Sequence, residues 1–352
     1  MGLGITINTM AIGPSDPFLE SASLVEVHER LGEPTTFRLR YAMDVDSRDF
    51  PLLTDGRLGV GTNIAILAPD AFGASCLVRG VVHAQQVHFE HGGAGSWLEV
   101  QGSDRLVLMD RESKSTAWTG TASTAAMTIL AGYQFIPDVQ PTTTAYSMQT
   151  HELVQRDSDY RFLRRLARRH GYLLWTTCNQ VGIETAHFKP APVSDPASAE
   201  LGVNVSPNSL ASFDLSWDVE RPTSVEALQL DLGTLSDVNG AATTPLSNLG
   251  TTPLAGIATG TRSIFLAAPA DDAGSLTARG EGALVDADLF LRGNCRTSVA
   301  QLGAVVRAHT VVNVNGLGSR HSGNYLVSAV RHTIDAAMHR MDVELLRNGW
   351  GS

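Results

Sequence analysis

The sequence predicts an α+β protein that is mainly β, with one small β unit present twice and a helix-containing segment between the copies. Near the C-terminus, apolar and polar residues alternate in three runs separated by Gly-rich breaks, which is typical of an antiparallel three-strand meander. An earlier segment shows three runs in the same order. The runs lie at residues 61–67, 76–85 and 96–101 in the first segment and within 311–335 and 339–348 in the second.

The two segments can be aligned so that Val81 and His83 lie over Val330 and His332. A chain of 352 residues is too long for one ordinary core and suits two or three domains. We expect a first β domain over residues 1–105, an α+β domain over 106–205 and a second β domain over 206–352. An exposed loop and helix are expected to be inserted in the last domain at about 233–290.

Composition limits the possible partners. The hydrophobic fraction of 43% can form large cores, whereas the net charge of −10 disfavours specific binding of nucleic acid. No run reaches the roughly 18 apolar residues that span a bilayer, and the N-terminus lacks the features of a signal peptide. We therefore expect synthesis and assembly in the cytoplasm. Cys76, Cys178 and Cys295 have no paired spacing and are expected to be reduced core residues.

The first domain begins with a predicted hairpin formed by residues 23–28 and 36–41. Gly32 and Pro34 provide the turn between its strands. Alternation places one set of side chains of each strand on the inward face. This set is Leu24 and Val27 in the first strand and Phe37, Leu39 and Tyr41 in the second. With the three strands that follow, a small barrel or sandwich of five or six strands results.

Residues 123–131 predict a short helix that opens the middle domain. Ser123 or Thr124 is its expected cap, and Ala126, Met127 and Leu130 are its expected buried residues.

A second helix is predicted over residues 157–170, with Asp157 or Ser158 as N-cap and Gly171 just past its end. Its apolar face comprises Tyr160, Leu163, Leu166 and Ala167, and its other face comprises Arg161, Arg164, Arg165, Arg168 and Arg169. Such a face is either solvated or docks an acidic neighbour, because arginine forms bidentate ion pairs. We interpret it as a candidate subunit contact. Residues 172–177 predict a buried strand.

The rest of the chain alternates strands with breaks. Residues 189–208 contain prolines and little periodicity, which indicates a loop or boundary, whereas 210–217 and 225–232 alternate as strands do. Residues 233–260 look too polar to bury and predict a mobile exposed loop. A helix is expected over about 275–287, although Gly280 and Gly282 each weaken it by about 1 kcal/mol relative to alanine.

Candidate chemistry is sparse. His83, His88 and His91 lie near one another, as do His332 and His339, but no carboxylate or cysteine recurs at metal-ligand spacing. Acidic pairs occur only at adjacent or alternate loop positions, and the common nucleophile, zinc-protease and phosphate-loop motifs are absent from the sequence. We expect no enzyme activity, no metal and no cofactor.

Two segments resemble a known family. Residues 158–175 resemble the "S-D-x-x-F-L-x-R-L-A-x-x-x-G" segment of the late control protein D family, the baseplate hubs of contractile phage tails and related injection machines. Residues 319–332 resemble the family's "F-S-G-x-Y-x-V-x-x-V-x-H" strand pair, with His321 at a position that is often aromatic. The matching residues are Asp159, Phe162, Leu163, Leu166, Gly171, Ser322, Gly323, Tyr325, Val327, Val330 and His332.

The resemblance implies two similar β-barrel domains with an inserted α+β domain, and three chains closed into a ring. Two barrels in each of three chains would adapt a sixfold inner tube to a threefold spike. Fused type VI spikes continue beyond the second barrel, whereas this sequence stops at Ser352. The implied partners are therefore further copies of the chain in a homotrimer, an inner tube protein, a separate spike protein and other baseplate components. The setting is a phage tail or an extracellular contractile injection system.

Three alternatives remain open at this level. The chain could be a β-rich module that binds glycan or cell-wall polymer, although its five tryptophans are scattered. It could be a cell-wall hydrolase, for which no acid/base pair is placed. It could also be the hub portion of a type VI-like spike.

Overall fold

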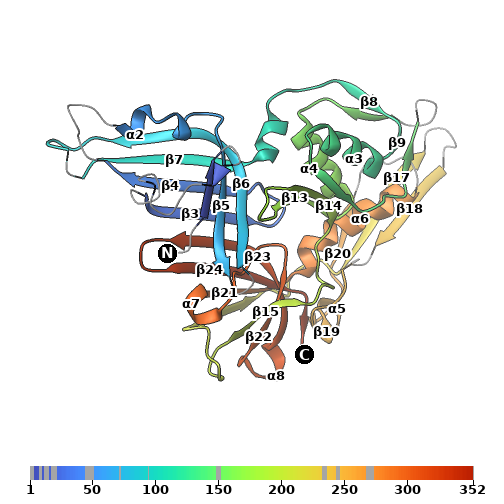
Figure 1. The fold of residues 1–352 in the computed structure, drawn as a ribbon. Helices are drawn as coiled ribbons and strands as arrows, with labels where there is room; N and C mark the ends of the chain where they lie inside the picture. Colours follow the sequence, from blue (N-terminus) through green and yellow to red (C-terminus); the bar gives the residue numbers. More distant parts are fainter. Residues whose placement is uncertain are drawn as a thin grey trace.

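The computed structural model describes residues 4–7, 10–11, 16, 22–43, 51–70, 73–93, 95–147, 152–231, 236–242, 246–266 and 273–351. The described chain is mainly β, as predicted, and its strands and helices form several packed parts (Figure 1).

The N-terminal part is a five-stranded antiparallel unit. Its strands are β3 (Ala22–Arg30), β4 (Thr36–Ala42), β5 (Asn63–Asp70), β6 (Gly73–His88) and β7 (Trp97–Asp104), and they lie in the order β3-β4-β7-β6-β5. The predicted hairpin and three following strands are confirmed. Phe37, Leu39 and Tyr41 are buried, but on β3 the buried residue is Val25 and not Leu24, because the buried positions follow Val27 at a spacing of two.

The C-terminal part has the same arrangement. Its strands are β16 (Phe213–Trp217), β21 (Leu291–Ser298), β22 (Val311–Asn315), β23 (Gly323–Ile334) and β24 (His339–Arg347). They pair in the order β16-β21-β24-β23-β22, so the predicted meander β22-β23-β24 is confirmed.

The two units share one topology. In each, an antiparallel pair of strands comes first in the chain, a meander of three strands follows, and the last meander strand pairs with the second strand of that pair. The predicted repeat therefore exists at the level of strand order. The histidine correspondence within it is wrong, because His83 is exposed beside a bulge in β6, whereas His332 is fully buried.

Strand β23 joins the two units. Its N-terminal half pairs with β22 and its C-terminal half pairs with β3, while β24 occupies its other edge. One continuous 13-stranded sheet results, which continues through β1 (Gly4–Ile7) and β2 (Met10–Ala11). Among the described strands this sheet is open, with β16, β2 and β15 at its free edges, so barrel closure stays an expectation.

The middle part contains two principal helices and a small sheet. These elements are α3 (Ala122–Gly132), α4 (Asp159–Arg169), β10 (Ile136–Val139), β13 (Tyr172–Cys178) and β14 (Glu184–Pro190). Both predicted helices are confirmed. In α3, however, Thr121 is the N-cap and Met127 is exposed; Ala126 and Leu130 pack into the core with Ile129.

Shorter elements complete the middle part and the edges of the two units. They are α2 (Pro51–Thr54), η1 (Gly56–Leu58), η2 (Arg105–Asp110), β8 (Thr116–Trp118), β9 (Gly120–Thr121), β11 (Ala145–Tyr146), β12 (Leu153–Gln155), α7 (Val299–Leu302) and α8 (Gly318–His321).

Residues 189–208 are more ordered than expected. They include β15 (Ala197–Gly202), which pairs in parallel with β22 and so extends the sheet of the C-terminal part. This strand was not predicted, because prolines on both sides obscure its short alternation.

An insertion separates β16 from β21. It contains β17 (Ser224–Asp231), β18 (Ser236–Ala242), β19 (Thr252–Pro253), α5 (Leu254–Ile257), β20 (Ser263–Leu266) and α6 (Ala273–Asp288). Helix α6 matches the predicted helix.

The expected exposed loop over 233–260 is wrong for the residues that the structure describes. Strand β18 pairs with β17, and β19 pairs with β25 (Gly349–Trp350). Leu246, Leu249 and Leu254 are buried. Burial of these leucines holds an otherwise polar segment against the rest of the protein, because it removes apolar surface from water.

No helix in the described ranges is both long enough and apolar enough to cross a membrane.

Candidate functional site

Helix α4 begins in a polar cluster that fixes its position. Ser158 is the N-cap and accepts a hydrogen bond from the Arg161 N–H. Asp159 accepts hydrogen bonds from Gln155 (2.7 Å), Lys114 (2.5 Å) and Tyr133 (2.8 Å). Burial opposes ionisation of Asp159, but these donors together hold the pKa of its carboxyl below the ordinary value. This motif residue therefore anchors α4.

The apolar motif residues of α4 form core. Phe162, Leu163 and Leu166 are fully buried in the middle part. Gly171 follows the helix with φ +65°, a conformation that favours glycine. These residues form the buried face and the end of α4.

The motif residues near the C-terminus surround a buried arginine. Arg347 is fully buried and donates to the carbonyls of His321 (3.1 Å), Ser322 (2.9 Å) and Leu249 (3.2 Å). Its guanidinium lies over the Tyr325 ring, and a Cβ on Gly323 would lie 2.7 Å from it. The remaining motif residues, Val327, Val330 and His332, are all buried in this part of the chain.

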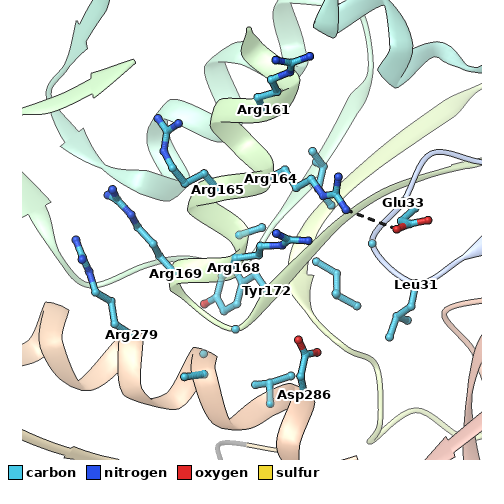
Figure 2. A pocket seen from close by; sticks show the side chains of 18 of the residues that line it. Leu31, Glu33, Arg161, Arg164, Arg165, Arg168, Arg169, Tyr172, Arg279 and Asp286 are labelled. Atoms are coloured by element: carbon cyan, nitrogen blue, oxygen red, sulfur yellow. Dashed lines mark ion pairs between the residues drawn. The ribbon is translucent and has the colours of Figure 1, made fainter. Parts of the chain in front are cut away.

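The cationic face of α4 lines a groove of about 1010 Å³. The groove lies between α4, the β3–β4 turn and α6, and Arg279 of α6 joins the five predicted arginines along it. Figure 2 shows Arg165, Arg169 and Arg279 in a row, with Arg164 and Arg168 reaching toward Glu33. The structure thus brings the predicted arginines together with one that the sequence did not indicate.

Three of the five predicted arginines pair with carboxylates of the same chain. Arg161 pairs with Asp110 at 3.0 Å, Arg164 approaches Glu33 at 3.6 Å, and Arg165 pairs with Asp157. Among the described residues, no carboxylate lies within 4.0 Å of Arg168 or Arg169. The groove therefore carries surplus positive charge in a chain of net charge −10.

Two glycines set the distance between α4 and α6. A Cβ on Gly282 would lie 2.6 Å from the Arg168 carbonyl oxygen, and a Cβ on Gly171 would lie 2.9 Å from Val285. A Cβ on Gly280 would likewise lie 2.9 Å from the Cβ of Ala242 in β18. The glycines that weaken α6 as an isolated helix are thus the residues that allow it to pack closely.

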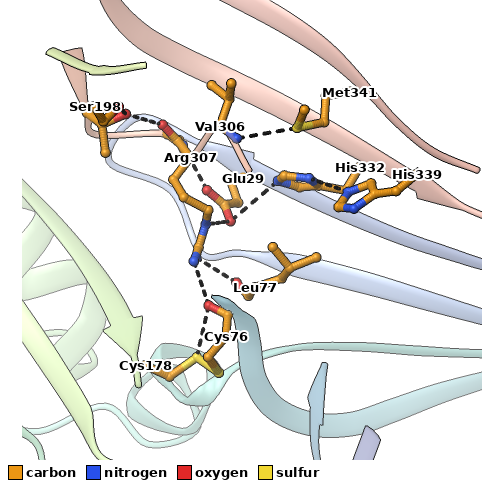
Figure 3. Close-up of polar contacts among 12 residues, drawn as sticks. Glu29, Cys76, Leu77, Cys178, Ser198, Val306, Arg307, His332, His339 and Met341 are labelled. Atoms are coloured by element: carbon orange, nitrogen blue, oxygen red, sulfur yellow. Dashed lines mark hydrogen bonds and ion pairs between the residues drawn. A yellow bond between two sulfur atoms is a disulfide. The ribbon is translucent and has the colours of Figure 1, made fainter. Parts of the chain in front are cut away.

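A buried polar junction connects the C-terminal part to the N-terminal unit (Figure 3). Arg307 donates to the Glu29 carboxylate (2.5 Å) and to the carbonyls of Cys76 (2.6 Å) and Leu77 (2.9 Å). Burial raises the pKa of Glu29, although Arg307 and the Ala308 N–H oppose the shift. One arginine of the C-terminal part thereby contacts both β3 and β6.

The expectation of three reduced cysteines is wrong for two of them. Cys76 of β6 and Cys178 of β13 form a disulfide, while Cys295 is free and buried. Spacing in the sequence gave no indication of this pair, because 102 residues separate its members and only the tertiary fold brings the two strands together. The disulfide crosslinks the N-terminal unit to the middle part.

A stack of three rings lies beside the junction. Trp175 lies between His187 and His309, with ring centroids 4.6 Å and 4.5 Å away. Nε2 of His309 accepts a hydrogen bond from the Gly32 N–H at 3.0 Å, and burial lowers the pKa of this imidazole to about 3. The neutral form of His309 is required for that hydrogen bond.

The described histidines outside the ring stack form no cluster of metal ligands. His332 Nδ1 lies 3.0 Å from His339 Nε2, and burial lowers the pKa of both imidazoles, that of His339 to about 4. His83 is exposed, and His88 stacks on Trp97. Within the described residues, no group of three or more His, Cys, Asp or Glu side chains could hold a metal ion.

Solved structures with the same fold are phage tail and secretion proteins. A tail protein from Neisseria meningitidis MC58 aligns with a TM-score of 0.68 at 14% identity, covering 99% of this chain and 97% of that protein. The 43 kDa tail protein of prophage MuSo2 from Shewanella oneidensis aligns with a TM-score of 0.68 at 12% identity, covering 98% of each chain. A type VI secretion system component of E. coli aligns with a TM-score of 0.59 at 11% identity, covering 99% and 79%.

The chain therefore shares its fold with these tail and secretion proteins. The sequence profile of the Alg8_N family, the Alg8 N-terminal domain, matches residues 35–336, and the chain belongs to this family. No curated protein sequence matches the chain.

Proposed function

We propose that the chain is a structural, non-enzymatic baseplate hub of a phage tail or contractile injection particle. In this proposal three copies form a ring that joins a sixfold inner tube to a threefold spike made by a separate protein. The resemblance to late control protein D hubs at residues 158–175 and 319–332 supports this role.

The observation that carries the proposal is the repeated strand order, β3-β4-β7-β6-β5 and β16-β21-β24-β23-β22. Two units of one topology in each chain give six similar positions around a threefold axis. A ring of this kind presents matching surfaces to a sixfold tube without needing six chains. The shared sheet supports the same reading, because pairing between β3 and β23 fixes the two units relative to each other.

In this proposal the β units make the ring contacts, and the arginine face of α4 contacts other baseplate components. The face is suited to that role because the carboxylates that pair with Arg161, Arg164 and Arg165 are partly exposed. Exposed pairs of this kind contribute little to folding, so they can exchange partners on assembly.

Oligomeric state and co-purification test the proposal. We expect the purified chain to sediment as a trimer and to co-purify with a tube or spike protein when these are expressed together. The variant Arg164→Glu/Arg165→Glu should keep the fold and the trimer but lose co-purification with other baseplate proteins. A chain that stays monomeric at high concentration and also captures neither tube nor spike would contradict the hub role.

A further inference from the structure

We propose that the arginine groove between α4, α6 and the β3–β4 turn binds an acidic, amphipathic segment of another protein. The bound segment would place carboxylates against the guanidiniums and apolar side chains against the apolar lining of the groove. This inference rests on the proposed function, because the hub role supplies the partner protein. It adds the chemistry of the segment that the partner would present.

The cationic wall has unused binding capacity. Arg168 and Arg169 have no carboxylate within 4.0 Å among the described residues, and the Arg161 side chain is 69% exposed despite its pair with Asp110. A guanidinium binds a carboxylate through two parallel hydrogen bonds, so each of these side chains can take an acidic group of a partner.

Helix capping does not account for the whole wall. Arg168 and Arg169 lie in the last turn of α4, where cations are favoured by the helix dipole even without a partner. Arg279, however, lies in the middle of α6, and Figure 2 shows it continuing the row of Arg165 and Arg169. The cationic row therefore spans two helices, and an extended ligand that follows it would contact arginines of both.

Apolar side chains also line the groove. They are Leu31, Leu173, Tyr172, Val285 and Leu266. Because Gly171 and Gly282 hold α4 and α6 in backbone contact, the two walls are fixed before any partner arrives. A preformed groove loses less entropy on binding than a mobile surface does.

The charge distribution favours a peptide over a nucleic acid. Glu33, Asp110 and Asp286 line the same groove as the arginines. These carboxylates would repel a continuous phosphate backbone, whereas a peptide can place apolar or polar residues opposite them.

The test measures binding of a fluorescein-labelled peptide that alternates glutamate and leucine to the purified full chain by fluorescence anisotropy. The variant Arg168→Glu/Arg169→Glu should weaken binding about tenfold or more, and Arg168→Gln/Arg169→Gln should weaken it less. The control Arg38→Glu/Arg292→Glu has the same charge change at exposed residues outside the groove and should bind as the native chain does. Added salt should reduce the native affinity.

Three results would overturn the inference. Equal binding by the native chain and the Arg168→Glu/Arg169→Glu variant would place the peptide elsewhere. Tighter binding of a single-stranded DNA oligonucleotide than of the acidic peptide would make the groove a nucleic-acid site. Loss of the trimer in this variant with unchanged peptide binding would make the groove a contact between copies. Because the peptide assay needs only the isolated chain, its failure would leave the trimer and co-purification experiments to decide the hub role.

Discussion

His309 lies in a site that favours the neutral imidazole. Its ring stacks on Trp175, and its Nε2 accepts the Gly32 N–H, so protonation would remove a hydrogen bond between two parts of the chain. The sequence offered no indication of this role, because neither the ring stack nor the hydrogen bond follows from local periodicity. The positive φ of 60° at this residue is likewise a property of the fold.

The first prediction concerns acid stability. The pKa of His309 falls from its ordinary 6.5 to about 3 on folding, so the unfolded chain binds the proton more readily. His309 therefore makes its full contribution to stability above about pH 6.5. As the pH falls toward 3, the free energy of unfolding decreases by at most about 1.4 kcal/mol per pH unit. His309→Asn tolerates the positive φ and should reduce the loss of melting temperature between neutral and mildly acidic pH.

A matched change, His91→Asn, replaces an exposed imidazole and controls for the loss of a histidine side chain. If the His309→Asn variant loses melting temperature on acidification as steeply as the native chain, His309 is not the responsible group.

At the scale of elements, the contact between α4 and α6 explains residues that sequence propensity misjudges. Gly280 and Gly282 reduce the intrinsic stability of α6, yet they allow its backbone to approach β18 and α4. The apolar and cationic faces of α4 were predicted correctly from helical spacing alone. The groove was not, because its other wall comes from an element more than a hundred residues further along the chain.

The second prediction follows from that contact. Gly282→Ala adds a Cβ 2.6 Å from the Arg168 carbonyl oxygen, so it should lower the free energy of unfolding although alanine gains about 1 kcal/mol in helix propensity. Forced overpacking of this kind typically costs about 1–3 kcal/mol. Gly132→Ala in α3, where nothing lies within 4 Å, should be neutral or stabilising. Equal melting temperatures for the two variants would show that α4 and α6 separate without cost.

The strand pattern was the most predictable part of the fold. Alternation identified both meanders and the hairpin at 23–41, because a sheet buried on one face repeats every two residues. Strands β15 and β18 escaped detection, since each is short and lies among prolines, glycines and polar residues. Pairings between distant strands, such as β3 with β23, need tertiary information that local patterns do not contain.

At the scale of the whole molecule, the Cys76–Cys178 disulfide fixes the middle part to the N-terminal unit. A crosslink that closes a loop of about a hundred residues restricts the unfolded chain. In the chain-entropy model this restriction stabilises the folded state by about 4–5 kcal/mol. Measured effects of removing native disulfides are commonly about 2–5 kcal/mol.

The third prediction is that reduction lowers the melting temperature measured by calorimetry. Cys178→Ser should reproduce the loss and abolish any further response to reductant. Cys295→Ala should keep the response to reductant, because Cys295 is not crosslinked. A native chain whose melting temperature is indifferent to reductant would count against a stabilising disulfide.

The pairing of β3 with β23 has a consequence for dissecting the molecule. The six residue pairs from Val25–Ile334 to Arg30–Ala329 lie between the first strand of one unit and the central meander strand of the other. A chain cut between the units would expose a row of unsatisfied backbone groups on both fragments, and such edges promote aggregation. The repeat is therefore easy to recognise by topology, but neither copy can be excised as a self-sufficient piece.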